Sequence, residues 1–145
     1  MTTLENIYIP DLNVSVPRSS KEKMAEIVHL PRMIDKARAH QADSLGEYIY
    51  PCPLDQQVLQ FLQVESEDFA KLTEKFDDDQ LTEWTLDQSR NRTSLERQAL
   101  SKGILNRKVN PRNWVEFKSM RDQIDPTRTE VTTWDGLTDL EEGHI

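Results

Sequence analysis

Residues 46–62 read GEYIYPCPLDQQVLQFL. Pro51 and Pro53 disfavour a helical conformation for the residue before each of them, so the segment is expected to begin extended. Because proline is well tolerated as the first residue of a helix, Pro53 predicts a helix start with Cys52 as its N-cap residue. The apolar residues that follow recur at helical spacing and would form one buried face; they are Leu54, Val58, Phe61 and Leu62.

Helix-start signals of the same kind recur along the chain, whereas the alternation typical of strands is hard to find. Asp77 with Gln80, and Thr93 with Glu96, have the spacing of capping boxes. The sequence therefore predicts a mainly α-helical fold, organised as one compact multi-helix domain.

The spacing of Ser19 and Glu22 also matches a capping box, and apolar residues recur at helical spacing from there to Leu30. This pattern predicts a helix that ends or restarts at Pro31. A second helix is expected to run from Pro31 to about Gln41.

Three regions differ in composition. Residues 1–18 contain two prolines and read as an extended arm, residues 19–124 hold the helix signals, and residues 125–145 are acidic. Apolar residues in the acidic region recur at helical spacing. We therefore expect the C-terminal segment to dock on the helical domain.

The chain has 145 residues, of which 36% are hydrophobic, and a formal net charge of -8. This composition suits one domain with its own core. No apolar run approaches the roughly 18 residues of a membrane span, and the first residues lack the order of a secretory signal. We expect a cytoplasmic protein without a membrane partner.

Residues 90–121 are rich in lysine and arginine, in contrast to the acidic remainder of the chain. The simplest interpretation is a basic segment that packs against acidic ones. A nucleic-acid interface is less favoured, because Trp114 and Phe117 are the only aromatic residues within this segment and the whole chain is acidic. We therefore expect no nucleic-acid partner.

Metal and nucleotide sites are weakly supported. One cysteine and three scattered histidines make a poor zinc-binding set, and the isolated glycines form no phosphate-binding loop. We expect neither a metal ion nor a cofactor.

The proline-rich turn concentrates the residues with chemical potential. Cys52 at a helix N-terminus would have a lowered pKa and could act as a nucleophile. Glu47 could serve as a base, while Tyr48 and Tyr50 could donate hydrogen bonds or a proton. The alternative is that Cys52 is a small buried residue and that the tyrosines fill a packing corner.

The preceding helix offers candidates for ligand binding. Arg32 and Lys36 lie one helical turn apart and could form an anion clamp, with Asp35 and Asp55 orienting their neighbours. The alternative is a solvated helix face with modest charge pairing, with Asp55 stabilising a helix start.

The motifs LPRMIDKARA (30–39) and GEYIYPCPLD (46–55) resemble those of a bacterial family, the domain of unknown function numbered five-zero-six-nine. Residues 17–19 and 131–143 are also similar to the ends of that family. The family has no settled activity. The resemblance implies that the charged residues of the two motifs form a polar site, or equally a buried polar network that fixes the corner.

Taken together, the residues predict a metal-free polar pocket around residues 31–55 that binds a small anionic or carbonyl-bearing molecule. Its chemistry would be acid/base or thiol chemistry, as in a lyase, isomerase or hydrolase that needs no cofactor. The alternative is a non-catalytic protein interaction module that uses the basic segment and the acidic tail. The sequence leaves homodimer formation open.

Overall fold

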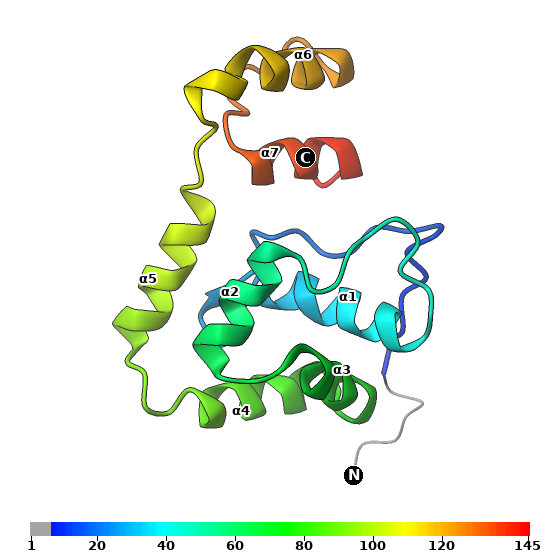
Figure 1. Cartoon of the computed structure of the whole chain (residues 1–145), viewed down its shortest axis with the longest axis vertical. Helices are drawn as coiled ribbons and strands as arrows, with labels where there is room; N and C mark the ends of the chain where they lie inside the picture. Colours follow the sequence, from blue (N-terminus) through cyan, green and yellow to red (C-terminus); the bar gives the residue numbers. More distant parts are fainter. Residues whose placement is uncertain (1–6) are drawn as a thin grey trace.

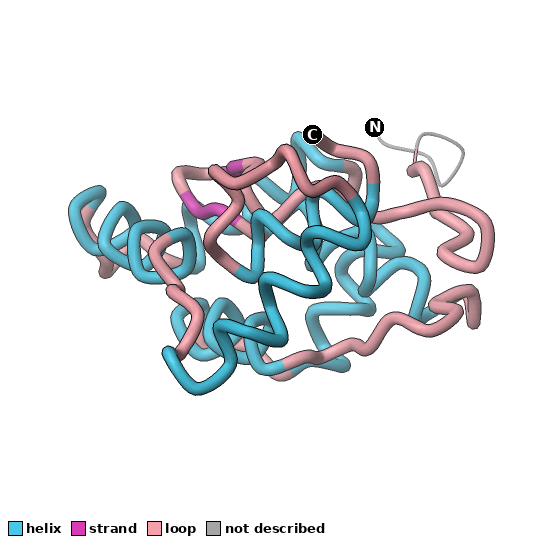
Figure 2. The backbone as a smooth tube through the Cα atoms, turned by 90° about the horizontal axis from the view of Figure 1, so that it is seen from above, coloured by secondary structure: helices cyan, strands magenta, loops and turns pink. Residues whose placement is uncertain are grey.

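A computed structural model describes residues 7–145, and in this part of the chain the fold is mainly α-helical, with seven α-helices. Figure 1 gives their order and Figure 2 shows how little of the chain is in strands. The helices are α1 (Leu30–Gln41), α2 (Pro53–Leu62), α3 (Ser66–Lys75), α4 (Asp78–Gln88), α5 (Ser94–Leu105), α6 (Trp114–Ile124) and α7 (Trp134–Glu142). The predicted fold class is confirmed.

Local capping signals place most of the helix starts. Asp77 and Thr93 accept hydrogen bonds from the backbone of the third helical residue, and Gln80 and Glu96 bond back to the two N-cap residues. Pro31 lies in the first turn of α1, as expected. Each of these starts depends on contacts within four residues, which is why the sequence pattern predicts them.

The predicted helix from Ser19 to Leu30 is wrong. The Glu22 carboxylate does accept a hydrogen bond from the Ser19 backbone N–H at 3.3 Å, but the chain then forms a hairpin of β1 (Lys23–Met24) and β2 (Ile27–Val28). Ala25 and Glu26 adopt positive φ angles of 52° and 67°, which a helix does not allow. The hairpin is tied to α5, because Ser101 Oγ accepts from the Val28 N–H and donates to the Glu26 carbonyl.

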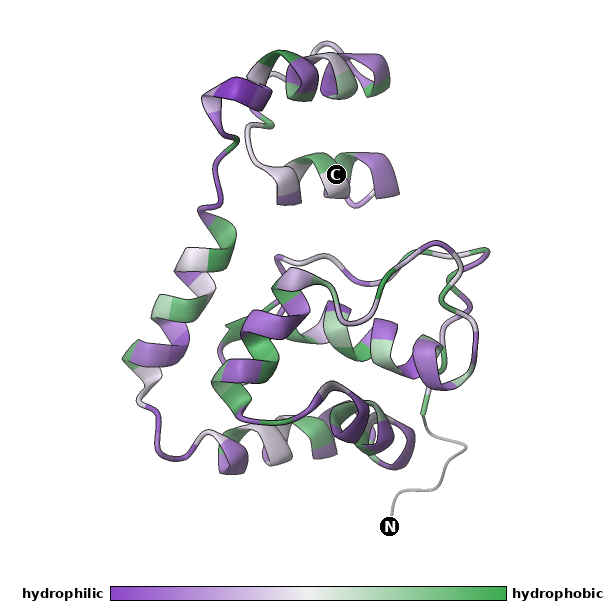
Figure 3. Ribbon diagram, in the orientation of Figure 1, coloured by the Kyte–Doolittle hydropathy of each residue, from purple (hydrophilic) through white to green (hydrophobic). Residues whose placement is uncertain are grey.

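The main core lies among α1, α2, α3, α4, α5 and the hairpin. Its fully buried side chains include Leu30, Ile34, Val58, Leu62 and Phe69. Apolar and hydrophilic residues are interspersed along α2 and α5, as expected for helices with one buried face (Figure 3).

A second, smaller core lies at the other end of α5. There α6 and α7 pack together (Figure 1). A short 3-10 turn, η2 (Pro111–Asn113), directly precedes α6 in the sequence. Phe117, Val131, Leu137 and Leu140 are its buried members. In the described chain, residues 7–145, no helix has both the length and the apolar character needed to cross a membrane.

The C-terminal helix contacts the chain that precedes α1. Ser19 Oγ donates a hydrogen bond to Asp139 of α7 at 2.7 Å, and His144 Nε2 lies 2.9 Å from the Pro17 carbonyl oxygen. Residues 7–18 contain turns but neither helix nor strand, whereas residues 1–6 of the expected arm lie outside the described residues. The chain before α1 and the chain end are therefore held side by side.

Candidate functional site

Cys52 occupies the N-cap of α2, as the two prolines predict. The Asp55 N–H donates to the Cys52 sulfur at 3.4 Å, and the Cys52 N–H donates to the Asp55 carboxylate at 2.9 Å. This reciprocal pair fixes the thiol at the positive end of the helix. The side chain remains partly exposed.

Asp55 is fully buried and carries the charge that organises the site. Its carboxylate lies 2.6 Å from His29 Nε2 and 2.7 Å from Lys36 Nζ. Burial alone would raise the pKa of Asp55, but the hydrogen bond from His29 and the charge of Lys36 outweigh burial and lower the pKa to about 2. Asp55 is thus an ionised carboxylate at neutral pH.

Lys36 is buried, with 4% of its side chain exposed. Its ammonium group donates to three acceptors: the Asp55 carboxylate, the Ile49 carbonyl oxygen at 3.0 Å and the Cys52 sulfur at 3.3 Å. These contacts use all three donors of a lysine side chain. Lys36 therefore holds its charge inside the protein, against Asp55 and the Cys52 sulfur.

Burial and the negative charge of Asp55 raise the pKa of the Cys52 thiol, but a hydrogen bond from His29, the charge of Lys36 and a hydrogen bond from the Asp55 backbone together lower it by more. The net direction is downward, which favours the thiolate. We call His29, Lys36, Cys52 and Asp55 the thiol cluster.

His29 is the member of the thiol cluster that sequence reasoning missed. It directly precedes α1 in a left-handed conformation, and its Nδ1 lies 2.9 Å from Ser20 Oγ. Only 1% of the residue is exposed. Because 26 residues separate His29 from Asp55, no local spacing predicts their contact. The sequence signal for His29 as a site residue is its position next to Leu30 and Pro31.

Three members of the thiol cluster are residues of types that can also bind a metal ion. One ligand atom from each of His29, Cys52 and Asp55 lies within 4.8 Å of the other two. Lys36 donates to two of these three groups, so a cation already balances them. The absence of a metal stays a prediction.

A second group of polar residues joins α1 to the C-terminus. Arg32 donates to both oxygens of Glu142, at 2.7 and 2.9 Å, and the Tyr48 hydroxyl donates to the same carboxylate at 2.9 Å. His144 Nε2 lies 3.3 Å from Glu142 as well. We call Arg32, Tyr48, Glu142 and His144 the latch cluster, because it holds the end of α7 on α1.

The latch cluster borders a cavity of about 780 Å³. Arg32, Tyr48 and Glu142 line it, together with the exposed Glu47. Burial and the hydrogen bond to Glu142 raise the pKa of Tyr48 to about 12, so its hydroxyl stays protonated at neutral pH.

The remaining two predicted residues lie apart from both clusters. Asp35 accepts from the backbone and the guanidinium of Arg18 at 2.8 and 2.9 Å. The Tyr50 hydroxyl donates to the Ser66 carbonyl oxygen at 2.6 Å, and burial raises its pKa. The eight predicted residues therefore surround no single pocket. The thiol cluster holds three of them, and the latch cluster with its cavity another three.

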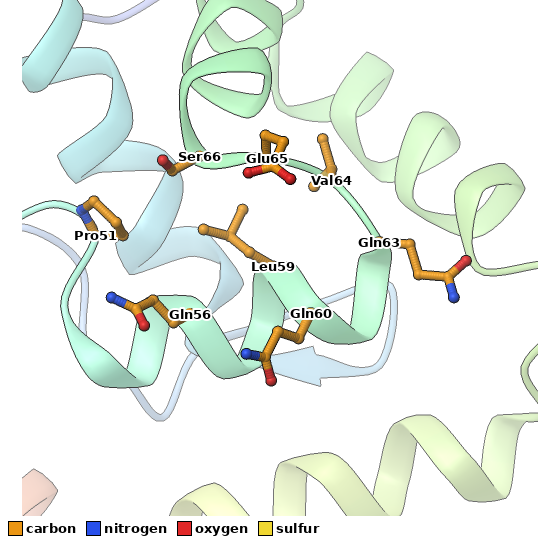
Figure 4. Close-up of a pocket in the computed structure, with 8 residues that line it drawn as sticks. All are labelled: Pro51, Gln56, Leu59, Gln60, Gln63, Val64, Glu65 and Ser66. Atoms are coloured by element: carbon orange, nitrogen blue, oxygen red, sulfur yellow. The ribbon is translucent and has the colours of Figure 1, made fainter.

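A further cavity of about 440 Å³ lies beside Pro51, between α2 and the loop that leads to α3 (Figure 4). It is rich in amide side chains and is lined by Pro51, Gln56, Leu59, Gln60, Gln63, Val64, Glu65 and Ser66. None of the eight predicted site residues is among these lining residues. No sequence motif predicts this cavity.

The sequence model of a protein family, described as a domain of unknown function (DUF5069), matches residues 14–144. The chain therefore belongs to this family, which confirms the predicted family resemblance. No curated protein matches the chain. Since the description of the family names no activity, function has to be argued from the geometry of the two clusters.

Proposed function

We propose that this member of the family is a small-molecule-binding protein in which Cys52 acts as a nucleophile on a carbonyl-bearing ligand. One observation carries the proposal. Cys52 is partly exposed, and its sulfur lies at the start of α2 with a buried ammonium group, Lys36 Nζ, at 3.3 Å. A helix N-terminus and a neighbouring cation both lower the pKa of cysteine thiols and so activate them.

The cluster also supplies the proton transfers that such chemistry needs. The thiolate would form a bond to the carbonyl carbon, and the electron pair of the C=O bond would move to the oxygen. Lys36 or His29 would then give that oxygen a proton. The products that follow would decide between a hydrolase, a lyase and an isomerase.

Asp55 serves to position its neighbours in this proposal. A carboxylate with a pKa of about 2 that already accepts from His29 and Lys36 is a weak base. Its negative charge keeps the Lys36 ammonium next to the sulfur and orients the His29 ring.

Because the nearby cations are already in ion pairs, we expect the ligand at Cys52 to be a neutral carbonyl compound rather than an anion. Lys36 is committed to Asp55, and Arg32 to Glu142. An anion clamp made of Arg32 and Lys36 would have to break the buried Lys36–Asp55 pair, which is costly, whereas an anion on Arg32 alone would only have to replace Glu142.

The test is the rate of Cys52 alkylation by iodoacetamide as a function of pH. Because the reagent is neutral and Cys52 is the only thiol, the profile needs no site assignment. We expect an apparent pKa below the ordinary value of about 8.5. Lys36→Met should shift the profile to higher pH, whereas Lys118→Met, at an exposed position on α6, should not. A thiol that reacts only after unfolding would refute the proposal.

One observation favours self-association through the basic segment as a second candidate function. Val115 on α6 is 81% exposed, and the exposed Arg112 and Lys118 flank it in the sequence. An apolar residue among positive charges suits an acidic partner surface, and the chain itself has a net charge of -8. Sedimentation velocity tests this candidate. We expect Val115→Asp to dissociate the dimer, and a monomeric wild-type protein would exclude self-association.

A further inference from the structure

The Glu142 carboxylate is held in the way proteins hold a carboxylate ligand. Both its oxygens accept from the Arg32 guanidinium, and the Tyr48 hydroxyl adds a third donor. The side chains of Arg32 and Glu142 are 9% and 8% exposed. A forked arginine contact combined with a tyrosine hydroxyl gives strong and geometrically specific recognition of a carboxylate.

The Glu142 carboxylate borders a cavity large enough to hold a small molecule. The cavity of about 780 Å³ is walled by Arg32, Tyr48 and Glu142, and also by Leu12 and Val16 of the chain before α1. Binding sites for small molecules commonly have volumes of this order. A molecule in the cavity could therefore reach the two donors that now hold Glu142.

The other charged groups of the cavity restrict the kind of ligand. Glu47 and Glu141 line the cavity and are exposed. Apart from Arg32, the charged residues that line the cavity are therefore acidic. A second negative group on the ligand would be repelled there, whereas an ammonium group would be attracted.

We propose that the cavity binds a zwitterionic amino carboxylate. The ligand carboxylate takes the place of Glu142 on Arg32 and Tyr48, and the ligand ammonium group faces Glu47 and Glu141. The site is separate from the thiol cluster, and the proposal does not depend on the chemistry of Cys52.

Displacing Glu142 requires little rearrangement. Glu142 is the last residue of α7, and Gly143 follows it with a positive φ of 80°. The rest of α7 is held independently, through the Asp139 contact to Ser19 and the packing of Leu137 and Leu140. For a ligand to enter, the final turn of α7 would have to move and His144 would have to give up its contacts to Glu142 and to the Pro17 carbonyl oxygen.

The experiment uses three five-carbon molecules that differ only in their end groups: 5-aminovalerate, glutarate and cadaverine. Each is titrated calorimetrically into the wild-type protein, Glu142→Ala and the control Glu116→Ala, which removes an exposed carboxylate from α6. We expect 5-aminovalerate to bind Glu142→Ala about tenfold more tightly than it binds the wild type or the control, because the internal competitor is gone. The double variant Arg32→Met/Glu142→Ala should lose this binding.

Two results would overturn the proposal. One is a folded Glu142→Ala protein, checked by circular dichroism, that binds none of the three molecules. The other is glutarate or cadaverine binding as tightly as 5-aminovalerate, which would refute the zwitterionic class. If Glu142→Ala does not fold, an NMR titration of the wild type decides: 5-aminovalerate should shift the Tyr48 and Glu142 amide signals, and unchanged signals would refute the proposal.

Discussion

The thiol cluster and the latch cluster both place cations of α1 against carboxylates, yet they differ in what they connect. Lys36 meets Asp55 of the next helix beside the main core, where 4% of the lysine side chain and none of the aspartate side chain is exposed. Arg32, one turn earlier on α1, meets Glu142 at the far end of the chain, beside an open cavity. One helix thus presents two buried charges, of which one lies against a thiol and the other holds the end of α7 beside a cavity.

The comparison can be tested most strongly by Asp55→Asn. This change leaves Lys36 and His29 buried without their carboxylate, and breaking a buried ion pair from one side costs about 3–5 kcal/mol. Urea unfolding at neutral pH should show a loss of this size. Asp87→Asn removes a carboxylate from an exposed pair with Arg90 and should cost less than about 1 kcal/mol. Equal losses in the two variants would mean that the thiol cluster is not a buried network.

A smaller effect is expected for Arg32→Met. Loss of the paired hydrogen bonds to Glu142, a charged group with 8% of its side chain exposed, should cost about 2–3 kcal/mol. Hydrogen exchange should become faster in residues 134–142, while the alkylation rate of Cys52 stays at the wild-type value. A changed alkylation rate would show that the two clusters are coupled, against the separation described above.

The pH dependence of stability gives a third and smaller effect. The folded pKa of Asp55, about 2, lies below its unfolded value of 3.8, so its ionisation stabilises the fold above pH 3.8. This contribution is lost as the pH falls from 3.8 towards 2. The stability gap between the wild type and Asp55→Asn should therefore narrow over this range in urea unfolding curves. A gap that stays constant from neutral pH down to pH 2 would contradict the assignment of the charge to Asp55.

Sequence alone predicts the parts of this molecule that depend on near neighbours. The starts of α2, α4 and α5 follow from capping residues and proline, and so does the position of Cys52 at an N-cap. Lys36 and Cys52 are 16 residues apart. The sequence predicts that the helix of Lys36 lies near the proline-rich turn, but it does not predict the contact between the two side chains.

Contacts between distant residues could not be predicted in the same way. His29 lies 26 residues before Asp55, and Glu142 lies 110 residues after Arg32. The local pattern at residues 23–28 predicts a helix, whereas the hairpin found there is held by Ser101 on α5, which no local pattern reveals. In each case the packing of the whole chain, rather than a local pattern, brings the partners together.

The central claim is that the thiol cluster stabilises the thiolate of Cys52. It is tested most directly by following the ultraviolet absorbance of the thiolate during a pH titration of the folded protein, with Cys52→Ser as the baseline. We expect a midpoint below the ordinary cysteine value of about 8.5 and a higher midpoint in Lys36→Met. A wild-type midpoint at or above the ordinary value would contradict it.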